Sequence, residues 1–275
     1  MKRATASLRL SDIATGMPGF RTKKGCKKHL RKTVKVMQSL QDKLYAQQQH
    51  AVLIVFQAMD AAGKDGMIKH VMSGLNPQGC QVTSFKQPTS EETSHDFLWR
   101  VQGKLPVRGQ IAIFNRSHYE EVLVVRVHPE LLAKERVAAS PKLWQRRYRR
   151  IRNTESHLAE NGTVIIKFFL HMSKGEQKRR FLARLNNPDR NWKFSSSDLK
   201  ERGCWRQYQK AYQEAIRATS TRSAPWYVIP ADCKWYARML VADIIVRTLK
   251  RIKPVYPSLD EVQAAELRQA KALLK

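Results

Sequence analysis

A buried strand that runs directly into a glycine-lysine turn constrains this chain more than any other feature of its sequence. The run AVLIVFQ at residues 51–57 does not alternate between polar and apolar residues, which is typical of a parallel strand covered on both faces. AMDAAGKDG follows at residues 58–66, and apolar residues then recur at helical spacing from Met67 to Leu75. Strand, turn and helix in this order predict a phosphate-binding loop, in which backbone N–H groups and a lysine hold phosphate oxygens.

The turn departs twice from the motif G-x-x-x-x-G-K-[ST]. Gly63 and Lys64 fit it, but Ala58 replaces the first glycine and Asp65 replaces the hydroxyl residue that normally reaches Mg²⁺. Because that ligand is missing, Asp60 is the candidate metal ligand, since Mg²⁺ favours one or two carboxylates plus phosphates and water. A turn of small residues with a solvated lysine is the alternative, and the position between a buried strand and a helix favours the phosphate site.

Four further apolar segments predict strands, and helical patterns separate them. The strands are expected at residues 80–85, 110–115, 163–170 and 226–230, and the helices at about 65–74, 90–101, 141–160, 175–186, 196–218 and 233–252. This alternation predicts an α/β fold with a parallel sheet flanked by helices.

We expect three parts along the chain. Residues 1–50 form a basic, helical N-terminal extension, residues 51–255 form the core, and residues 256–275 form a helical tail. Within the core, a basic stretch with an Asn-Asn-Pro-Asp break lies after the fourth strand. Because phosphoryl-transfer enzymes often insert a mobile lid at that place, we expect a lid at about residues 172–200.

Charge and composition narrow the class of protein. The chain has 51 Lys and Arg against 23 Asp and Glu, a net charge of +28, which argues for a polyanionic partner. With 42% hydrophobic residues it is too apolar for a disordered basic tail. It shows no signal sequence and no apolar run of the ~20 residues that cross a membrane, and its four cysteines stand alone, so we expect a cytoplasmic protein without a membrane partner.

The end of the third strand supplies a second group of candidate residues. Asn115 and Arg116 lie at the carboxyl end of this strand, which faces the ligand crevice in a parallel sheet. Arg116 can clamp a phosphate with two hydrogen bonds and stabilise charge on a transferring group. Glu120 and Glu121 open the next helix, where capping is the plainer explanation for at least one of them.

Long segments of the chain resemble the type 2 polyphosphate kinases, in particular their class III. The resemblance covers roughly residues 20–255 and is carried by IVFQAMDAAGKDG, IAIFNRSHYEEVLVVRVHP and RNWKFSSSDLKERGCW. It implies a P-loop kinase core related to thymidylate kinase, with a helical lid. It also implies reversible transfer of the terminal phosphoryl group of inorganic polyphosphate to AMP and ADP, with Mg²⁺ as cofactor and Mn²⁺ as a substitute. Guanine nucleotides stay open as acceptors, and the family habit is a homodimer or homotetramer.

The resemblance assigns roles to individual residues. Asp60, Lys64 and Arg116 carry over as catalytic residues, with Asp60 also the metal ligand. We assign phosphate and polyphosphate binding to Ala61, Ala62, Gly63, Lys64, Asp65, Gly66, Lys69, Lys178, Arg179, Arg180 and Lys193. We assign the nucleotide acceptor to Phe85, Lys86, Asn115, Arg116 and Glu120. Many relatives carry Gly at the position of Ala58 and Asp at that of Asn115, and the second departure fits class III.

Two alternatives remain beside direct in-line transfer from polyphosphate. An ATP-dependent nucleoside monophosphate kinase would share the fold and the loop but would not need so large a positive charge. An RNA- or DNA-binding protein would suit the charge, but the sequence has no aromatic RNP pattern, zinc spacing or homeodomain-like helix, so we expect no specific nucleic-acid partner.

Overall fold

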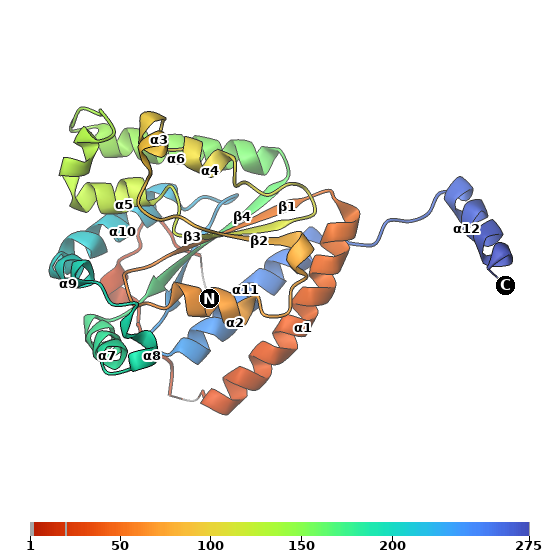
Figure 1. Ribbon diagram of the computed structural model, residues 1–275, viewed down its shortest axis with the longest axis horizontal. Helices are drawn as coiled ribbons and strands as arrows, with labels where there is room; N and C mark the ends of the chain where they lie inside the picture. Colours follow the sequence, from red (N-terminus) through yellow and green to blue (C-terminus); the bar gives the residue numbers. More distant parts are fainter. Residues whose placement is uncertain (1–2, 20, 275) are drawn as a thin grey trace.

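A five-stranded parallel sheet carries the fold, as Figure 1 shows. The computed structural model describes residues 3–19 and 21–274, apart from the side chain of Arg190. The strands are β1 (Ala51–Gln57), β2 (Cys80–Ser84), β3 (Ile111–Asn115), β4 (Thr163–His171) and β5 (Trp226–Pro230). They lie in the order β2-β3-β1-β4-β5, and all four pairings are parallel. The predicted strands and the α/β class are therefore confirmed.

Helices cover both faces of the sheet (Figure 1). On one face lie α1 (Lys23–Gln47), α2 (Lys64–Val71) and α11 (Lys234–Ile252), and on the other lie α5 (Glu120–Val127), α6 (Leu143–Glu160) and α10 (Trp205–Thr219). The sequence of β1 does not alternate because both faces of this strand are buried. Ile54 and Phe56 belong to the core on the α1 and α11 side, whereas Leu53 and Val55 belong to the core on the α10 side.

The remaining helices are shorter or lie outside the two layers. They are α3 (Ser90–Ser94), α4 (Trp99–Gln102), α7 (Lys174–Leu185), α8 (Pro188–Asn191), α9 (Ser196–Gly203) and α12 (Glu261–Leu273). Helix α12 extends away from the body in Figure 1 and buries none of its residues. Among the described residues, no helix combines the length and the apolar composition that a membrane crossing requires.

Three of the predicted helices were wrong in extent. The helix expected at 90–101 is two short helices, because His95 is extended and the Asp96 carboxylate accepts a hydrogen bond from Leu98 N–H to start a new turn. The helix expected at 196–218 breaks at Cys204, directly after Gly203. Helix α2 ends at Val71, earlier than expected.

The N-terminal segment is packed onto the rest of the chain. Helix α1 lies against α11 and contributes the fully buried side chains of Met37 and Leu44 to the core. Gln41, also buried, accepts a hydrogen bond from Asn76 N–H at 2.8 Å and donates one to the Asn76 carbonyl at 2.9 Å. These contacts hold the segment between α2 and β2 in place, at the amino end of β2.

Candidate active site

The turn between β1 and α2 has the backbone of an anion-binding loop. Gly63 caps α2 with a φ of 94°, in the left-handed region that glycine adopts without strain, and Ala61 is also left-handed with a φ of 61°. The first helical hydrogen bond of α2 runs from Met67 N–H to the Gly63 carbonyl, so the N–H groups of residues 64–66 precede the helical ladder. Ala58 does not have a positive φ, which explains why this position tolerates a residue other than glycine.

Strand register brings the end of β3 against this loop. Asn115 pairs with Phe56 on one side and with Ser84 on the other, and Arg116 N–H donates to the Phe56 carbonyl at 3.0 Å. The Asn115 amide donates a hydrogen bond of 2.8 Å to the Asp65 carboxylate at the start of α2. An aspartate at position 115 would instead set two carboxylates against each other, so the amide suits this loop.

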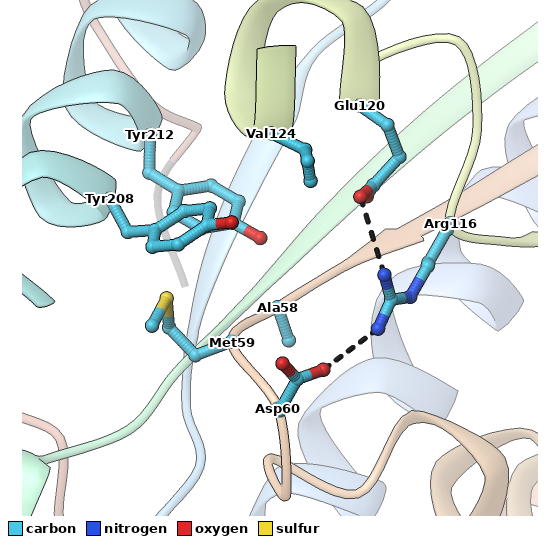
Figure 2. Close-up of a pocket in the computed structure, with 8 residues that line it drawn as sticks. All are labelled: Ala58, Met59, Asp60, Arg116, Glu120, Val124, Tyr208 and Tyr212. Carbon is cyan, nitrogen blue, oxygen red and sulfur yellow. Dashed lines mark hydrogen bonds and ion pairs between the residues drawn. The ribbon is translucent and has the colours of Figure 1, made fainter. Parts of the chain in front are cut away.

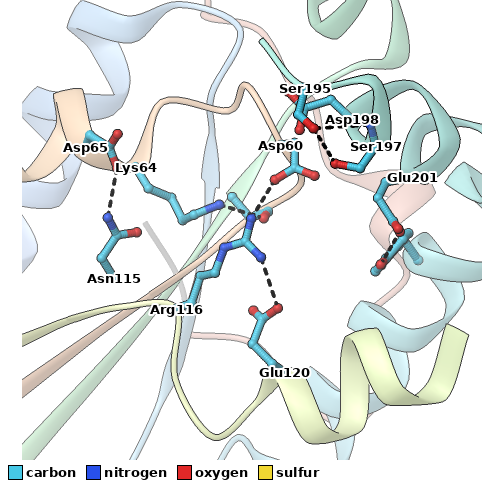
Figure 3. A network of polar contacts seen from close by, with 12 residues as sticks. Asp60, Lys64, Asp65, Asn115, Arg116, Glu120, Ser195, Ser197, Asp198 and Glu201 are labelled. Carbon is cyan, nitrogen blue, oxygen red and sulfur yellow. Dashed lines mark hydrogen bonds and ion pairs between the residues drawn. The ribbon is translucent and has the colours of Figure 1, made fainter. Parts of the chain in front are cut away.

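An arginine joins two carboxylates beside the loop, as Figures 2 and 3 show. The Arg116 guanidinium lies 2.7 Å from Asp60 Oδ1 and 3.5 Å from Glu120 Oε2. Glu120, and then Asp60, raise the pKa of Arg116, so it stays charged. Arg116 itself has a left-handed φ of 64°, a conformation that costs of order 1 kcal/mol in a residue with a side chain.

The loop lysine is buried. Lys64 is 9% exposed, and its Nζ donates a hydrogen bond of 3.0 Å to the Ala58 carbonyl (Figure 3). Burial lowers the pKa of Lys64 from 10.5 to about 8, and the Arg116 guanidinium acts in the same direction. A phosphate anion placed on the loop would favour the charged ammonium, so this lysine is poised to gain an anionic partner.

The loop opens into a cleft of about 1330 Å³. Among the described residues that line it, ten are Lys or Arg and four are Asp. The cleft brings together most of the residues that the sequence predicted: Asp60, Ala61, Ala62, Gly63, Lys64, Asp65, Gly66, Lys69, Phe85, Lys86, Asn115, Arg116, Arg179, Arg180 and Lys193. Glu120 lines a small adjoining pocket with Asp60 and Arg116 (Figure 2), whereas exposed Lys178 lines neither space.

Several residues of the cleft were missed by the sequence analysis. Arg184, Lys234, Arg238 and Asp198 line it as well. Lys234 and Arg238 occupy the first turns of α11, directly after β5, so their position at the carboxyl end of a strand could have identified them. Asp198 comes from α9, and no sequence signal places that helix beside the loop.

The carboxylates of the cleft fit a divalent ion that takes most of its ligands from bound phosphate groups and water. No described residue donates a hydrogen bond to Asp60 Oδ2, and burial and the nearby Asp60 carboxylate raise the pKa of Asp198. The described residues contain no group of three His, Cys, Asp or Glu side chains that could hold a metal ion. One or two carboxylates completed by phosphate oxygens and water is the coordination that suits Mg²⁺.

Comparison with known proteins agrees with this geometry. The family model of polyphosphate kinase 2 matches residues 21–256. The chain is 51% identical over 261 residues to the ADP-polyphosphate phosphotransferase of Rhodopseudomonas palustris, covering 94% of this chain and 90% of that relative. It is 52% identical over 221 residues to the AMP/ADP-polyphosphate phosphotransferase of Meiothermus ruber, covering 80% of each. The crystal structure of polyphosphate kinase 2 from Arthrobacter aurescens TC1 is similar with a TM-score of 0.91 and 40% identity, covering 99% of this chain and 95% of that one.

Proposed function

Because this chain belongs to the polyphosphate kinase 2 family, we propose that it transfers the terminal phosphoryl group of inorganic polyphosphate to AMP and ADP, and that the reaction is reversible. The observation that carries the proposal is the phosphate loop in a cleft where ten Lys and Arg side chains face four Asp side chains. Polyphosphate is a long polyanion without base edges, so a groove of Lys and Arg is the recognition that it requires.

The loop residues hold the transferring phosphoryl group in this proposal. Lys64 and the N–H groups at the start of α2, with Ala61, Ala62, Gly63, Asp65 and Gly66 forming the turn, bind its oxygens. Arg116, which contacts Asp60 and Glu120, turns onto the phosphate and stabilises its charge. In the sheet, β2 and β4 flank the central pair of β3 and β1 that carries this centre. Phe85 and Lys86 follow β2 on one side, and the proposed lid follows β4 on the other.

The two substrates approach the loop from these two sides. We assign the acceptor nucleotide to Phe85, Lys86, Asn115, Arg116 and Glu120. We assign the polyphosphate chain to Lys69, Arg179 and Lys193 in the cleft and to exposed Lys178 outside it, and the last three belong to the proposed lid. Positioning of the two substrates lets the bond from phosphorus to the chain break while the bond to the acceptor oxygen forms in line.

No covalent intermediate on the protein is required. His118 is 6% exposed, and burial lowers its pKa to about 3, so it is held neutral inside the core. Direct transfer therefore depends on position and charge neutralisation, which the cleft supplies.

The family uses a divalent metal ion for phosphoryl transfer. We propose that the ion is Mg²⁺, with Mn²⁺ as a substitute, and that Asp60 Oδ2 is its carboxylate ligand. When bound, the ion neutralises charge on the phosphate oxygens as they transfer. Asp198, whose carboxylate interacts with that of Asp60, would be a second candidate to hold the ion.

Three further properties belong to the same proposal. Guanine nucleotides are candidate acceptors, and the assembly is a homodimer or homotetramer, as the class III resemblance implies. The location is the cytoplasm, because the nucleotide substrates occur there and because Cys26, Cys80, Cys204 and Cys233 are all free thiols. A panel of AMP, ADP, GMP and GDP tests the first property, and sedimentation of the purified protein tests the second.

A comparison of phosphoryl donors tests the proposed function. The purified protein with Mg²⁺ is given ADP and polyphosphate in one reaction, and AMP and ATP without polyphosphate in another, and the nucleotides are separated by chromatography. We expect ATP to form in the first reaction. Formation of ADP in the second reaction alone would identify an ATP-dependent monophosphate kinase. No new nucleotide in either reaction would favour the nucleic-acid-binding alternative.

A further inference from the structure

Arg180 lies in helix α7 of the proposed lid, yet its side chain is only 6% exposed. All five of its N–H groups have acceptors in the protein. Nε donates to Glu176 at 2.7 Å, Nη1 donates to the carbonyls of Ala61 at 3.1 Å and Ala62 at 2.7 Å, and Nη2 donates to those of Ala231 at 2.5 Å and Asp232 at 3.1 Å. The guanidinium therefore has no N–H group left to donate to a phosphate in this arrangement.

These contacts fix the backbone of the phosphate loop. In a planar trans peptide the C=O and the following N–H point in opposite directions. Because Arg180 holds the Ala62 carbonyl, it directs the Gly63 N–H to the opposite side of the loop. The left-handed conformation of Ala61 is unfavourable for a residue with a side chain and needs contacts that hold it, and Arg180 supplies one through the Ala61 carbonyl.

Arg180 also joins three segments that border the cleft. Its partners lie in the loop after β1, in the segment after β5, and in its own helix α7. Gln177, one turn earlier on α7 and 1% exposed, adds a hydrogen bond of 3.0 Å to the Asp60 carbonyl. The face of α7 that meets the loop is thus bonded to backbone carbonyls of the loop.

The neighbouring arginine shares the Glu176 carboxylate but differs in its exposure and in its contacts with the loop. The Arg179 side chain is 66% exposed, and its partner is the Glu176 carboxylate on the same helix. It can leave this exposed pair at little cost and turn to a phosphate chain. The two adjacent arginines therefore form a natural internal comparison.

We propose that Arg180 is a positioning residue that holds the phosphate loop in its binding conformation, and that it does not itself bind polyphosphate. The inference rests on the proposed phosphoryl transfer at this loop and changes the role that the sequence analysis gave to Arg180. In this role the shape of the guanidinium group is essential as well as its charge. A lysine at this position would present a single nitrogen, which cannot reach carbonyls on two segments.

Kinetics of matched variants test the proposal. In Arg180→Lys, which keeps the charge, we expect kcat to fall by on the order of 10²-fold, as displaced catalytic groups do, while KM for polyphosphate and its salt dependence stay near those of the wild type. In Arg179→Gln we expect KM for polyphosphate to rise and its salt dependence to flatten, with kcat retained. A wild-type kcat in Arg180→Lys, or a raised and flattened KM with kcat retained, would overturn the positioning role. Inactive wild-type protein would instead refute the proposed function.

A measurement on the unaltered protein covers the case in which Arg180→Lys does not fold. The arginine Nη–H signals are followed by ¹⁵N nuclear magnetic resonance while polyphosphate is added. We expect the Nη1–H groups of Arg180, which donate to the Ala61 and Ala62 carbonyls, to exchange slowly with water before and after addition and to keep their shifts, while the Arg179 signals move. Rapid exchange of the Arg180 Nη1–H groups in the free protein, or a large shift on binding, would show that its bonds to the loop do not persist.

Discussion

Turnover with polyphosphate is expected to fall by on the order of 10³-fold when Lys64 is replaced by alanine, the loss that follows removal of a donor to a transition-state oxygen. Lys64 is 9% exposed, and its Nζ is held 3.0 Å from the Ala58 carbonyl inside the loop. Burial lowers the pKa of Lys64 to about 8, so its charge adds little to the stability of the fold. The charge contributes mainly to the binding of an anionic ligand. Single-turnover rates at saturating polyphosphate and Mg²⁺ measure the effect on the chemical step.

A matched control separates this loss from a general loss of charge. Lys104→Ala also removes one positive charge, but Lys104 is exposed and does not line the cleft. Its turnover and its urea denaturation curve should match those of the wild type. If Lys64→Ala keeps near-normal turnover, or loses it only because the variant is unfolded, the role of Lys64 in the loop is refuted.

Glu155→Gln is expected to destabilise the fold by about 3–5 kcal/mol, because it leaves a buried ammonium without a counter-charge. Lys167 lies in the middle of β4 with 0% exposure, and its Nζ contacts Glu155 Oε2 at 2.5 Å, the Tyr119 hydroxyl at 2.8 Å and the Thr219 carbonyl at 2.8 Å. The Tyr119 hydroxyl donates to the other oxygen of Glu155 at 2.7 Å. Breaking the pair therefore leaves a charge for which no water is available.

Replacing both partners should cost far less than replacing one. In a double variant, Glu155→Leu with Lys167→Met, no charge is buried, and substitution of a whole buried ion pair by apolar residues is often neutral. Free energies of unfolding for Glu155→Leu, Lys167→Met and the double variant, taken from urea denaturation, form a double-mutant cycle. Additive effects in this cycle would mean that the buried pair is not coupled.

The sequence predicts the sheet well because each strand carries its own signal. The run at residues 51–57 is apolar throughout, and both faces of β1 are indeed covered by core residues. The predicted helices failed where a local side chain competes with the helix, as Asp96 does by accepting from Leu98 N–H. A periodicity argument does not detect such a contact.

The candidate residues of the loop could be placed from the sequence because motif and strand end coincide there. Asp60, Lys64 and Arg116 follow β1 and β3, whose pairing places them together. Asp198 and Arg180 reach the loop from helices that are far away in sequence, so no local pattern reveals what they contact. The sequence shows Lys167 only as an interruption of an apolar strand, because its partner Glu155 belongs to the preceding helix.

The names of two similar relatives differ in the acceptor. The Rhodopseudomonas palustris protein is named for ADP and the Meiothermus ruber protein for AMP and ADP, and their identities to this chain are 51% and 52%. Identity therefore does not select between them. The resemblance of the segment around Asn115 to class III is what predicts AMP as an acceptor.

The most direct measurement supplies AMP as the only nucleotide, with polyphosphate and Mg²⁺, and follows AMP, ADP and ATP over time. A parallel reaction contains ADP in place of AMP, and Lys64→Ala serves as the inactive control. The account predicts that ADP appears first and ATP follows, with no ATP added at the start. Consumption of ADP in the parallel reaction while AMP is left untouched would contradict it.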